Sequence, residues 1–271
     1  METKKVVIVI SIIISLIIIS SIAISNPFLV DRAFYRMGFQ EQICFPNSDD
    51  VFKSDNVTNI AVAADFGVTK NSVKTLENIH SSNPEVVLIP GDLSYSTAEE
   101  WIEFAEFMGK TNIYIAFGDA EPMEEREKLL EYYGLNNNYY SFDYENVHFL
   151  SIDTTDEKNE WGIISDDKMQ LNFIRTDLSH AYNDPEIDFT IVIMHLPMYS
   201  SRDGGSFMDM RNELQPIFDL YGVDLVLNGH RHAYERTYPV MFNNIVTDNE
   251  DCLYDDPNGQ IYLTVGTGGH S

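Results

Sequence analysis

The chain has few cysteines and few positive charges. Its 271 residues include only Cys44 and Cys252, too few for a disulfide scaffold or a zinc finger. Lys and Arg number 17 against 43 Asp and Glu, and the formal net charge is -26. An acidic surface of this strength repels phosphate backbones, so we expect no non-specific binding of nucleic acid. It also disfavours anionic ligands unless bound cations reverse the field locally.

Charge is absent from residues 6–25, which are apolar or small and follow Lys4 and Lys5. A helix of this length rises about 30 Å, the thickness of a bilayer core. We therefore expect one N-terminal hydrophobic helix within residues 1–25, acting as a transmembrane anchor or as a cleaved signal peptide. Either function places the rest of the chain outside the cytoplasm, membrane-anchored or secreted. There, Cys44 and Cys252 could form a disulfide.

Beyond this segment, residues 26–56 lack apolar periodicity and are interpreted as a stalk, and one domain is expected over 57–271. In the domain, short apolar runs alternate with segments in which apolar residues recur at three-to-four spacing. Buried strands alternating with helices predict an α/β domain with its sheets inside. The predicted strands are 59–64, 86–90, 113–117, 147–152, 190–194, 224–228 and 261–265, and the predicted helices are 70–82, 97–109, 122–134, 166–181 and 209–221.

Side chains that can bind metal ions follow five of these predicted strands. In open α/β sheets, ligands bind beyond the carboxyl ends of the strands, so we expect these side chains to meet in one crevice. Taken singly, each could be turn chemistry or a structural histidine. Carboxylates together with imidazoles favour Zn, Fe or Mn over Ca or Mg. The set is Asp65, Asp92, Asp119, His195, and His230 with His232.

At these positions the chain resembles the calcineurin-like metallophosphoesterases and, among them, the purple acid phosphatases. The resemblance covers roughly residues 59–271 and implies a layered sandwich of two mixed β-sheets flanked by helices. It also implies hydrolysis of phosphate esters by attack of a metal-bound hydroxide. Domains of this family usually continue past the last strand, which leaves truncation at the C-terminus open. The motifs that carry the resemblance are at 65–67, 91–95, 118–121, 195 and 229–232.

The resemblance further implies two metal ions bridged by Asp92, most readily iron with zinc, manganese or a second iron. Tyr95 distinguishes the purple enzymes, in which a phenolate binds ferric iron. The alternative for Tyr95 is a buried aromatic whose hydroxyl is hydrogen-bonded. The implied ligands of the first ion are Asp65, Tyr95 and His232, and those of the second are His195, His230 and a residue of 118–121, which we take to be Asp119.

Two residues and one loop depart from the family pattern. The loop is 201–206, which lacks the histidines that the purple enzymes carry after the His195-type ligand. Asp119 stands where the family has Asn, and Ala120 stands where it has a His that contacts phosphate or protonates the leaving group. A positioned general acid contributes about 10²–10⁴ in rate. Two functions therefore stay open: an impaired phosphoesterase and a metal-binding but catalytically silent module. A third function, a serine hydrolase, is not supported, because the sequence contains no G-x-S-x-G motif.

Two other residues could replace the missing histidine in catalysis. His270 follows the last predicted strand, and Arg202 lies in the loop 201–206, where it could bind a phosphate. The alternative is an exposed terminal histidine and a surface arginine. The remaining histidines, His80, His148 and His180, lie in predicted helices or strands and are interpreted as structural.

Overall fold

The computed structural model describes residues 58–108, 112–155, 168–246 and 257–270. Residues Ser201–Ser206 group apart from the rest, and the remaining described residues form one unit built on two sheets. The first sheet consists of β1 (Ile60–Val62), β2 (Val86–Pro90) and β3 (Asn112–Ala116), all parallel.

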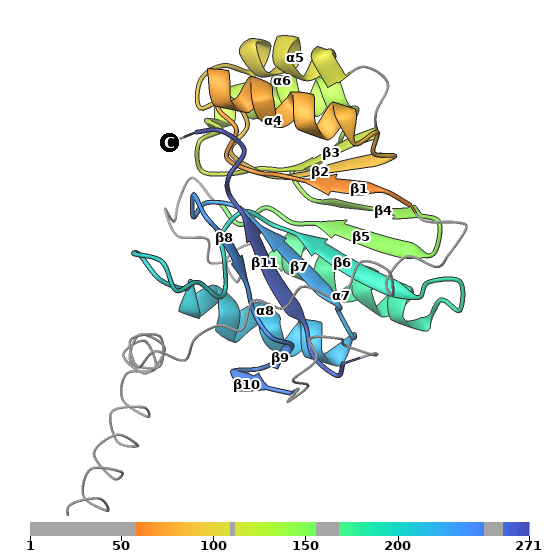
Figure 1. Cartoon of the computed structure of the whole chain (residues 1–271). Coiled ribbons are helices and arrows are strands. Elements are labelled where there is room, and N and C mark those ends of the chain that lie inside the picture. The colour runs from red at the N-terminus through yellow and green to blue at the C-terminus, as the bar shows by residue number, and fades with distance from the viewer. Residues whose placement is uncertain (1–57, 109–111, 156–167, 247–256, 271) are drawn as a thin grey trace, which may run out of the picture. The chain divides into compact units, whose positions relative to one another are not determined.

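One layer of helices covers the outer face of this sheet (Figure 1). Apolar side chains of the helices and strands form a shared core in which the rings of Phe66 and Trp101 meet edge to face at 5.6 Å. Thr69 begins the first helix with a capping box, in which its side chain and that of Ser72 satisfy each other's backbone N–H groups. The helices are α4 (Lys70–Ser81), α5 (Ala98–Ala105), the short 3-10 helix η1 (Glu106–Met108) and α6 (Met123–Tyr133).

The second sheet has six strands in the order β4-β5-β6-β7-β11-β8. Its four central strands are parallel, and the edge strands β4 and β8 are antiparallel to their neighbours. The helices α7 (Lys168–Asn183) and α8 (Met208–Leu220) pack on its outer face (Figure 1). The strands are β4 (Tyr140–Tyr144), β5 (Val147–Ser151), β6 (Phe189–Ile193), β7 (Leu225–Asn228), β8 (Tyr234–Arg236) and β11 (Ile261–Val265), and β9 (Val240–Met241) pairs with β10 (Asn244–Ile245).

The inner faces of the two sheets pack on each other, which gives a helix–sheet–sheet–helix sandwich (Figure 1). After β1, the Ala64 N–H donates a hydrogen bond to the Val265 carbonyl at the end of β11, over 3.1 Å. The carboxyl ends of strands from both sheets therefore meet at one edge. The buried residues between the sheets are Val86, Leu88, Ala116, Phe149, Ile193 and Leu227.

A buried histidine ties the outer part of the second sheet to its helix. His148 on β5 places Nδ1 2.7 Å from Asp143 Oδ1 on β4 and Nε2 2.9 Å from Asp177 Oδ2 on α7. Burial alone would lower the pKa of His148, but the hydrogen bonds to Asp177 and Asp143 and the charges of these carboxylates together outweigh burial and raise that pKa.

The prediction of an α/β fold with sheets flanked by helices is confirmed. All seven predicted strands and all five predicted helices are present, with bounds shifted by one or two residues or, for α5, ended early and continued as η1. The larger sheet is mixed, whereas every pair in the smaller sheet is parallel. The edge strands β4, β8, β9 and β10 were not predicted.

The N-terminal hydrophobic helix, the stalk at 26–56, Cys44 and Cys252 lie outside the described residues. In the described ranges, no helix combines the length and apolar character needed to cross a membrane.

Candidate metal centre

The predicted ligands all follow the carboxyl ends of strands. Four of them adopt a positive φ, which non-glycine residues rarely do. The angles are 59° at Asp65, 57° at Asp92, 60° at Tyr95 and 66° at His230. Such a conformation costs about 1–3 kcal/mol and clusters at functional sites, where it directs side chains inward.

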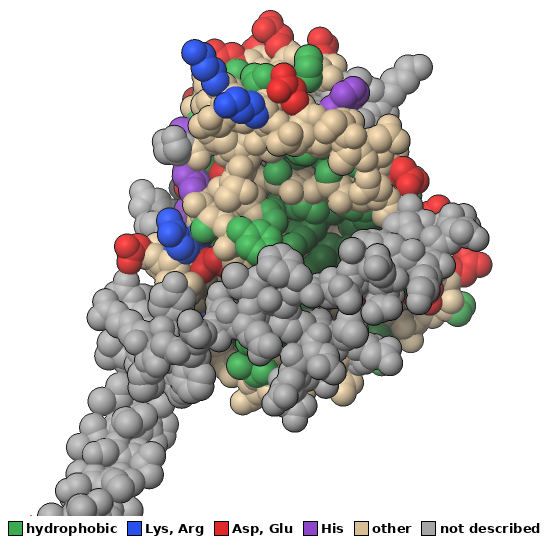
Figure 2. Space-filling model, in the orientation of Figure 1, with side chains coloured by type: hydrophobic (Ala, Val, Ile, Leu, Met, Phe, Trp, Pro, Cys, Tyr) green, Lys and Arg blue, Asp and Glu red, His purple; other side chains and the backbone are tan. Residues whose placement is uncertain are grey.

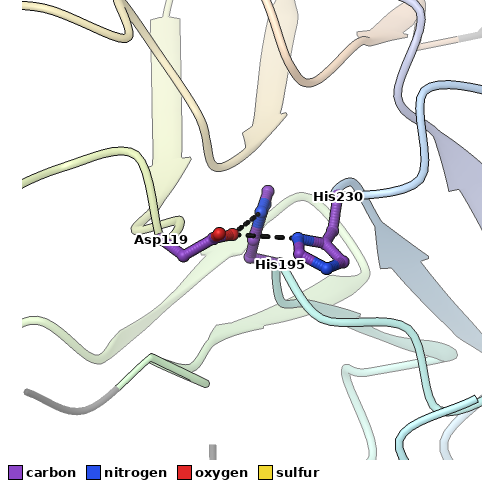
Figure 3. Close-up of side chains that lie close together, drawn as sticks. All are labelled: Asp119, His195 and His230. Atoms are coloured by element: carbon purple, nitrogen blue, oxygen red, sulfur yellow. Dashed lines mark hydrogen bonds and ion pairs between the residues drawn. The ribbon is translucent and has the colours of Figure 1, made fainter. Parts of the chain in front are cut away.

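The first group of ligand atoms belongs to Asp119, His195 and His230, whose side chains point toward one another (Figure 3). His195 is fully buried, and its Nδ1 lies 2.8 Å from the Pro90 carbonyl. Because a carbonyl only accepts, Nδ1 donates its proton there, which leaves Nε2 2.9 Å from Asp119 Oδ1 and 3.2 Å from Asp92 Oδ1. His230 Nδ1 is also 2.9 Å from Asp119 Oδ1.

The second group belongs to Asp65, Asp92 and His232, with Tyr95 beside it. The Tyr95 hydroxyl donates to Asp65 Oδ1 over 3.1 Å and lies 3.0 Å from His232 Nε2. Both Asp65 oxygens also accept from the His230 N–H, at 2.9 and 3.1 Å. In each group the candidate ligand atoms lie within 4.8 Å of one another. Asp92 contacts the first group through His195, so it joins the two.

Charges of like sign are crowded in this centre. Burial raises the pKa of Asp65 to about 7, with the charge on His195 opposing the rise. Burial would lower the pKa of His195, but the neighbouring Asp92 and Asp119 raise it to about 10. Burial and the charges of Asp65 and Asp92 raise the pKa of Tyr95. A cation bound among these carboxylates would offset their mutual repulsion.

The pKa values of Asp119 and His232 are lowered. Burial would raise the pKa of Asp119, but the hydrogen bonds from His195 and His230, together with the charges of these histidines, lower it further than burial raises it. Burial and then the charge of His270 lower the pKa of His232. Carboxylate oxygens and imidazole nitrogens that face one another in this way are a donor set suited to Zn, Fe or Mn. The residues fit a pair of such ions.

Two glycines allow the backbone to pass close to the ligands. A Cβ on Gly118 would collide with Asp92 Oδ1, and a Cβ on Gly229 would lie 2.8 Å from Asp65 Oδ2. A side chain at either position would displace a carboxylate of the centre.

The next residues are Asp119 and Ala120, which depart from the family pattern, and His270 and Arg202, which were predicted to replace the missing histidine. The Asp119 side chain is half exposed. The Ala120 N–H donates to Asp92 Oδ1 over 2.9 Å, whereas its methyl side chain has no proton to donate. His270 stacks on the Tyr95 ring. Arg202 lies in the segment that groups apart, so its predicted contact with substrate stays a prediction.

Sequence reasoning did not identify the residues that support the ligand loops. The buried carboxylate of Glu121 accepts from the backbone N–H groups of Asp92, Leu93 and Gly118 at 3.1, 2.6 and 2.7 Å. Burial, and then the charge of Asp92, raises the pKa of Glu121 to about 7. Its place within the 118–121 motif was the sequence signal that could have found it.

Arg126 on α6 binds carbonyl groups of the same loop. Its Nε donates to the Glu121 carbonyl over 2.9 Å, and its Nη2 donates to the Gly118 carbonyl over 2.8 Å. Its Nη1 forms a buried ion pair with Asp153 Oδ2 at 2.7 Å. An arginine within an amphipathic helix gives no sequence signal for such a role.

Comparison with known proteins agrees with this geometry. The calcineurin-like phosphoesterase profile matches residues 58–234. Purple acid phosphatase 18 of Arabidopsis thaliana is 31% identical over 232 residues, which are 78% of this chain and 49% of the relative. The chain thus spans about half the length of the curated relatives it matches.

Two solved structures share the fold. Purple acid phosphatase PPD1 of yellow lupin superposes with a TM-score of 0.66 at 22% identity, over 80% of this chain and 45% of that chain. GAP50 of Plasmodium, described as the anchor in the inner membrane complex, superposes with a TM-score of 0.57 at 17% identity, over 78% of this chain and 71% of that chain. With its profile match and the gathered ligand residues, the chain belongs to the calcineurin-like phosphoesterase family.

Proposed function

We propose that the chain is a phosphoesterase with two metal ions, similar to purple acid phosphatases, that hydrolyses phosphate esters. The observation that carries the proposal is the pair of ligand groups, Asp65–Asp92–His232 and Asp119–His195–His230, which meet at one edge of the two sheets. The match to purple acid phosphatases over most of the chain supports the same activity.

The two ions, iron with zinc, manganese or iron, would each be held by one group, with Tyr95 added to the first and Asp92 shared. Bound there, the ions supply positive charge for the phosphate oxygens and lower the pKa of water. That charge offsets the acidic surface, on which Asp and Glu side chains gather over α5 and α6 (Figure 2).

The chain's own residues determine which esters suit the site. Asp119 adds a negative charge near the second ion, and Ala120 has no proton for a leaving group. Esters with acidic leaving groups, such as aryl phosphates, need no such proton and should be the best substrates. Asp92 lies between the groups and keeps its orientation through the Ala120 N–H.

A catalytically silent module that binds metal is the second candidate, and Ala120 favours it. The Plasmodium anchor protein has a similar fold, and a fold alone does not specify catalysis. For location, the uncharged residues 6–25 support a protein outside the cytoplasm, anchored or secreted.

Turnover of p-nitrophenyl phosphate by the full chain, loaded with iron, zinc or manganese, tests the proposal. The wild type should turn over, His230→Ala should lose that activity, and His80→Ala should keep it, since His80 is exposed on α4. A wild type that binds metal but turns over the substrate no faster than His230→Ala would establish the silent module instead.

A further inference from the structure

His270 lies flat against the side chain of Tyr95. The two rings are parallel within 7°, and their centroids are 3.6 Å apart. The imidazole also meets the ring of His232 edge to face, at 5.4 Å and 83°. One face of the Tyr95 phenol is therefore covered by His270, while the hydroxyl at its tip contacts Asp65 and His232.

Backbone hydrogen bonds hold His270 in this place. Its N–H donates to the Asp65 carbonyl over 3.0 Å, and the Gly268 N–H donates to the Ala64 carbonyl over 2.7 Å. The hydroxyl of Thr69, the N-cap of α4, donates to the carbonyl of the residue before His270 over 3.1 Å. The segment after β11 is thus fastened to the loop after β1 that carries Asp65.

Tyr95 needs such support because of its backbone. Its φ of 60° places it outside regular strand or helix geometry, and it follows β2 in a partly exposed loop. Parallel stacking at van der Waals distance restricts the rotation of an aromatic ring. His270 is the side chain that supplies this stacked contact.

The packing around His270 leaves no spare room at Gly67. A Cβ on Gly67 would lie 3.0 Å from His270 Nδ1 and 3.4 Å from His270 Cβ. The glycine of the 65–67 motif therefore makes space for the imidazole that stacks on Tyr95.

We propose that His270 is a positioning residue that holds the Tyr95 phenol in place to bind the first metal ion. The inference rests on the proposed function, because it assigns the first ion to Asp65, Tyr95 and His232.

The stack can be tested by NMR of the full chain with ¹³C-labelled tyrosine rings, the Tyr95 resonance being assigned by its loss in Tyr95→Phe. His270→Ala should remove the ring-current shift of that resonance, and His270→Phe, which keeps a flat ring, should retain an upfield position. Gly67→Ala should also move the resonance. Gly134→Ala is its matched control, because Gly134 has a similar positive φ of 66° but nothing within 4 Å of an added Cβ.

Titration with ferric ion alone tests the link to metal binding. His270→Ala should lower the affinity about 10–100-fold, as is typical for a residue that orients a ligand, and should change the tyrosinate charge-transfer absorption. His270→Phe should recover most of both. If His270→Ala leaves the Tyr95 resonance, the affinity and the absorption unchanged, the inference is wrong and the proposed function stands. If the wild type itself binds no ion, both the inference about His270 and the proposed function are wrong.

Discussion

The buried ion pair of Arg126 with Asp153 helps to hold the loop 118–121, and its contribution to the free energy of unfolding can be measured. Replacing Arg126 with Met keeps the apolar stem of the side chain but removes the guanidinium. The Asp153 carboxylate then loses its ion-pair partner, and the carbonyls of Gly118 and Glu121 lose the hydrogen bonds that Arg126 donates. Removing one member of a buried pair typically costs about 3–5 kcal/mol. The free energy of unfolding of Arg126→Met should fall by that amount at neutral pH.

The pH dependence of this loss has a defined sign. Burial raises the pKa of Asp153, and the charge of Arg126 opposes the rise. In Arg126→Met that opposition is gone, so the carboxyl takes up a proton more readily. The penalty of an unpaired carboxylate should therefore shrink as the pH falls and the group becomes neutral.

Urea denaturation of the full chain is the assay, with Arg175→Met as the control because Arg175 is exposed on α7. Arg126→Met/Asp153→Asn removes the unpaired charge and should regain part of the lost stability. A loss in Arg126→Met no larger than in Arg175→Met, or a double variant no more stable than Arg126→Met, would refute the reasoning.

Three further predictions concern the centre and the second sheet. Glu121→Gln places an amide NH₂ group against one backbone N–H that the carboxylate now accepts from. It should lower the free energy of unfolding by about 1–3 kcal/mol and the zinc affinity about 10–100-fold. If Glu121 does not support the ligand loops, both quantities should stay unchanged. The pKa of His148 is raised in the folded protein, so the wild type should be more stable than His148→Gln by its full margin below about pH 6.5. This margin should disappear as the pH rises through the folded pKa. A difference in denaturation midpoints that does not change with pH would contradict this. Asp119→Asn/Ala120→His should raise p-nitrophenyl phosphate turnover toward the general-acid factor of about 10²–10⁴, and no gain would mean that the pocket lacks other groups as well.

The sequence predicts the layers of the fold well because their strands are buried apolar runs. β2, Val86–Pro90, is buried at every residue, and its predicted bounds are those observed. β4, Tyr140–Tyr144, was missed because this edge strand is half-buried and reads YSFDY, without a clear apolar run. β8 has three residues and no buried side chain, so only its pairing with β11 defines it.

The candidate ligands could be picked out from the sequence for the same reason: each follows a strand that the apolar pattern locates. The residues that hold them could not. Glu121 and Arg126 act on backbone atoms, some of which lie far along the chain, and such contacts leave no pattern in side-chain types. The stack of His270 on Tyr95 joins segments that only the pairing of the loops after β1 and β11 brings together.

Metal stoichiometry tests the central claim most directly. The purified full chain, equilibrated with zinc or manganese and freed of excess ion, should contain two equivalents by elemental analysis. Asp92→Ala should lose both, because Asp92 is the residue shared by the two ligand groups. A wild type that retains less than one equivalent, or an Asp92→Ala protein that still retains two, would contradict a shared pair of ions at this edge of the sheets.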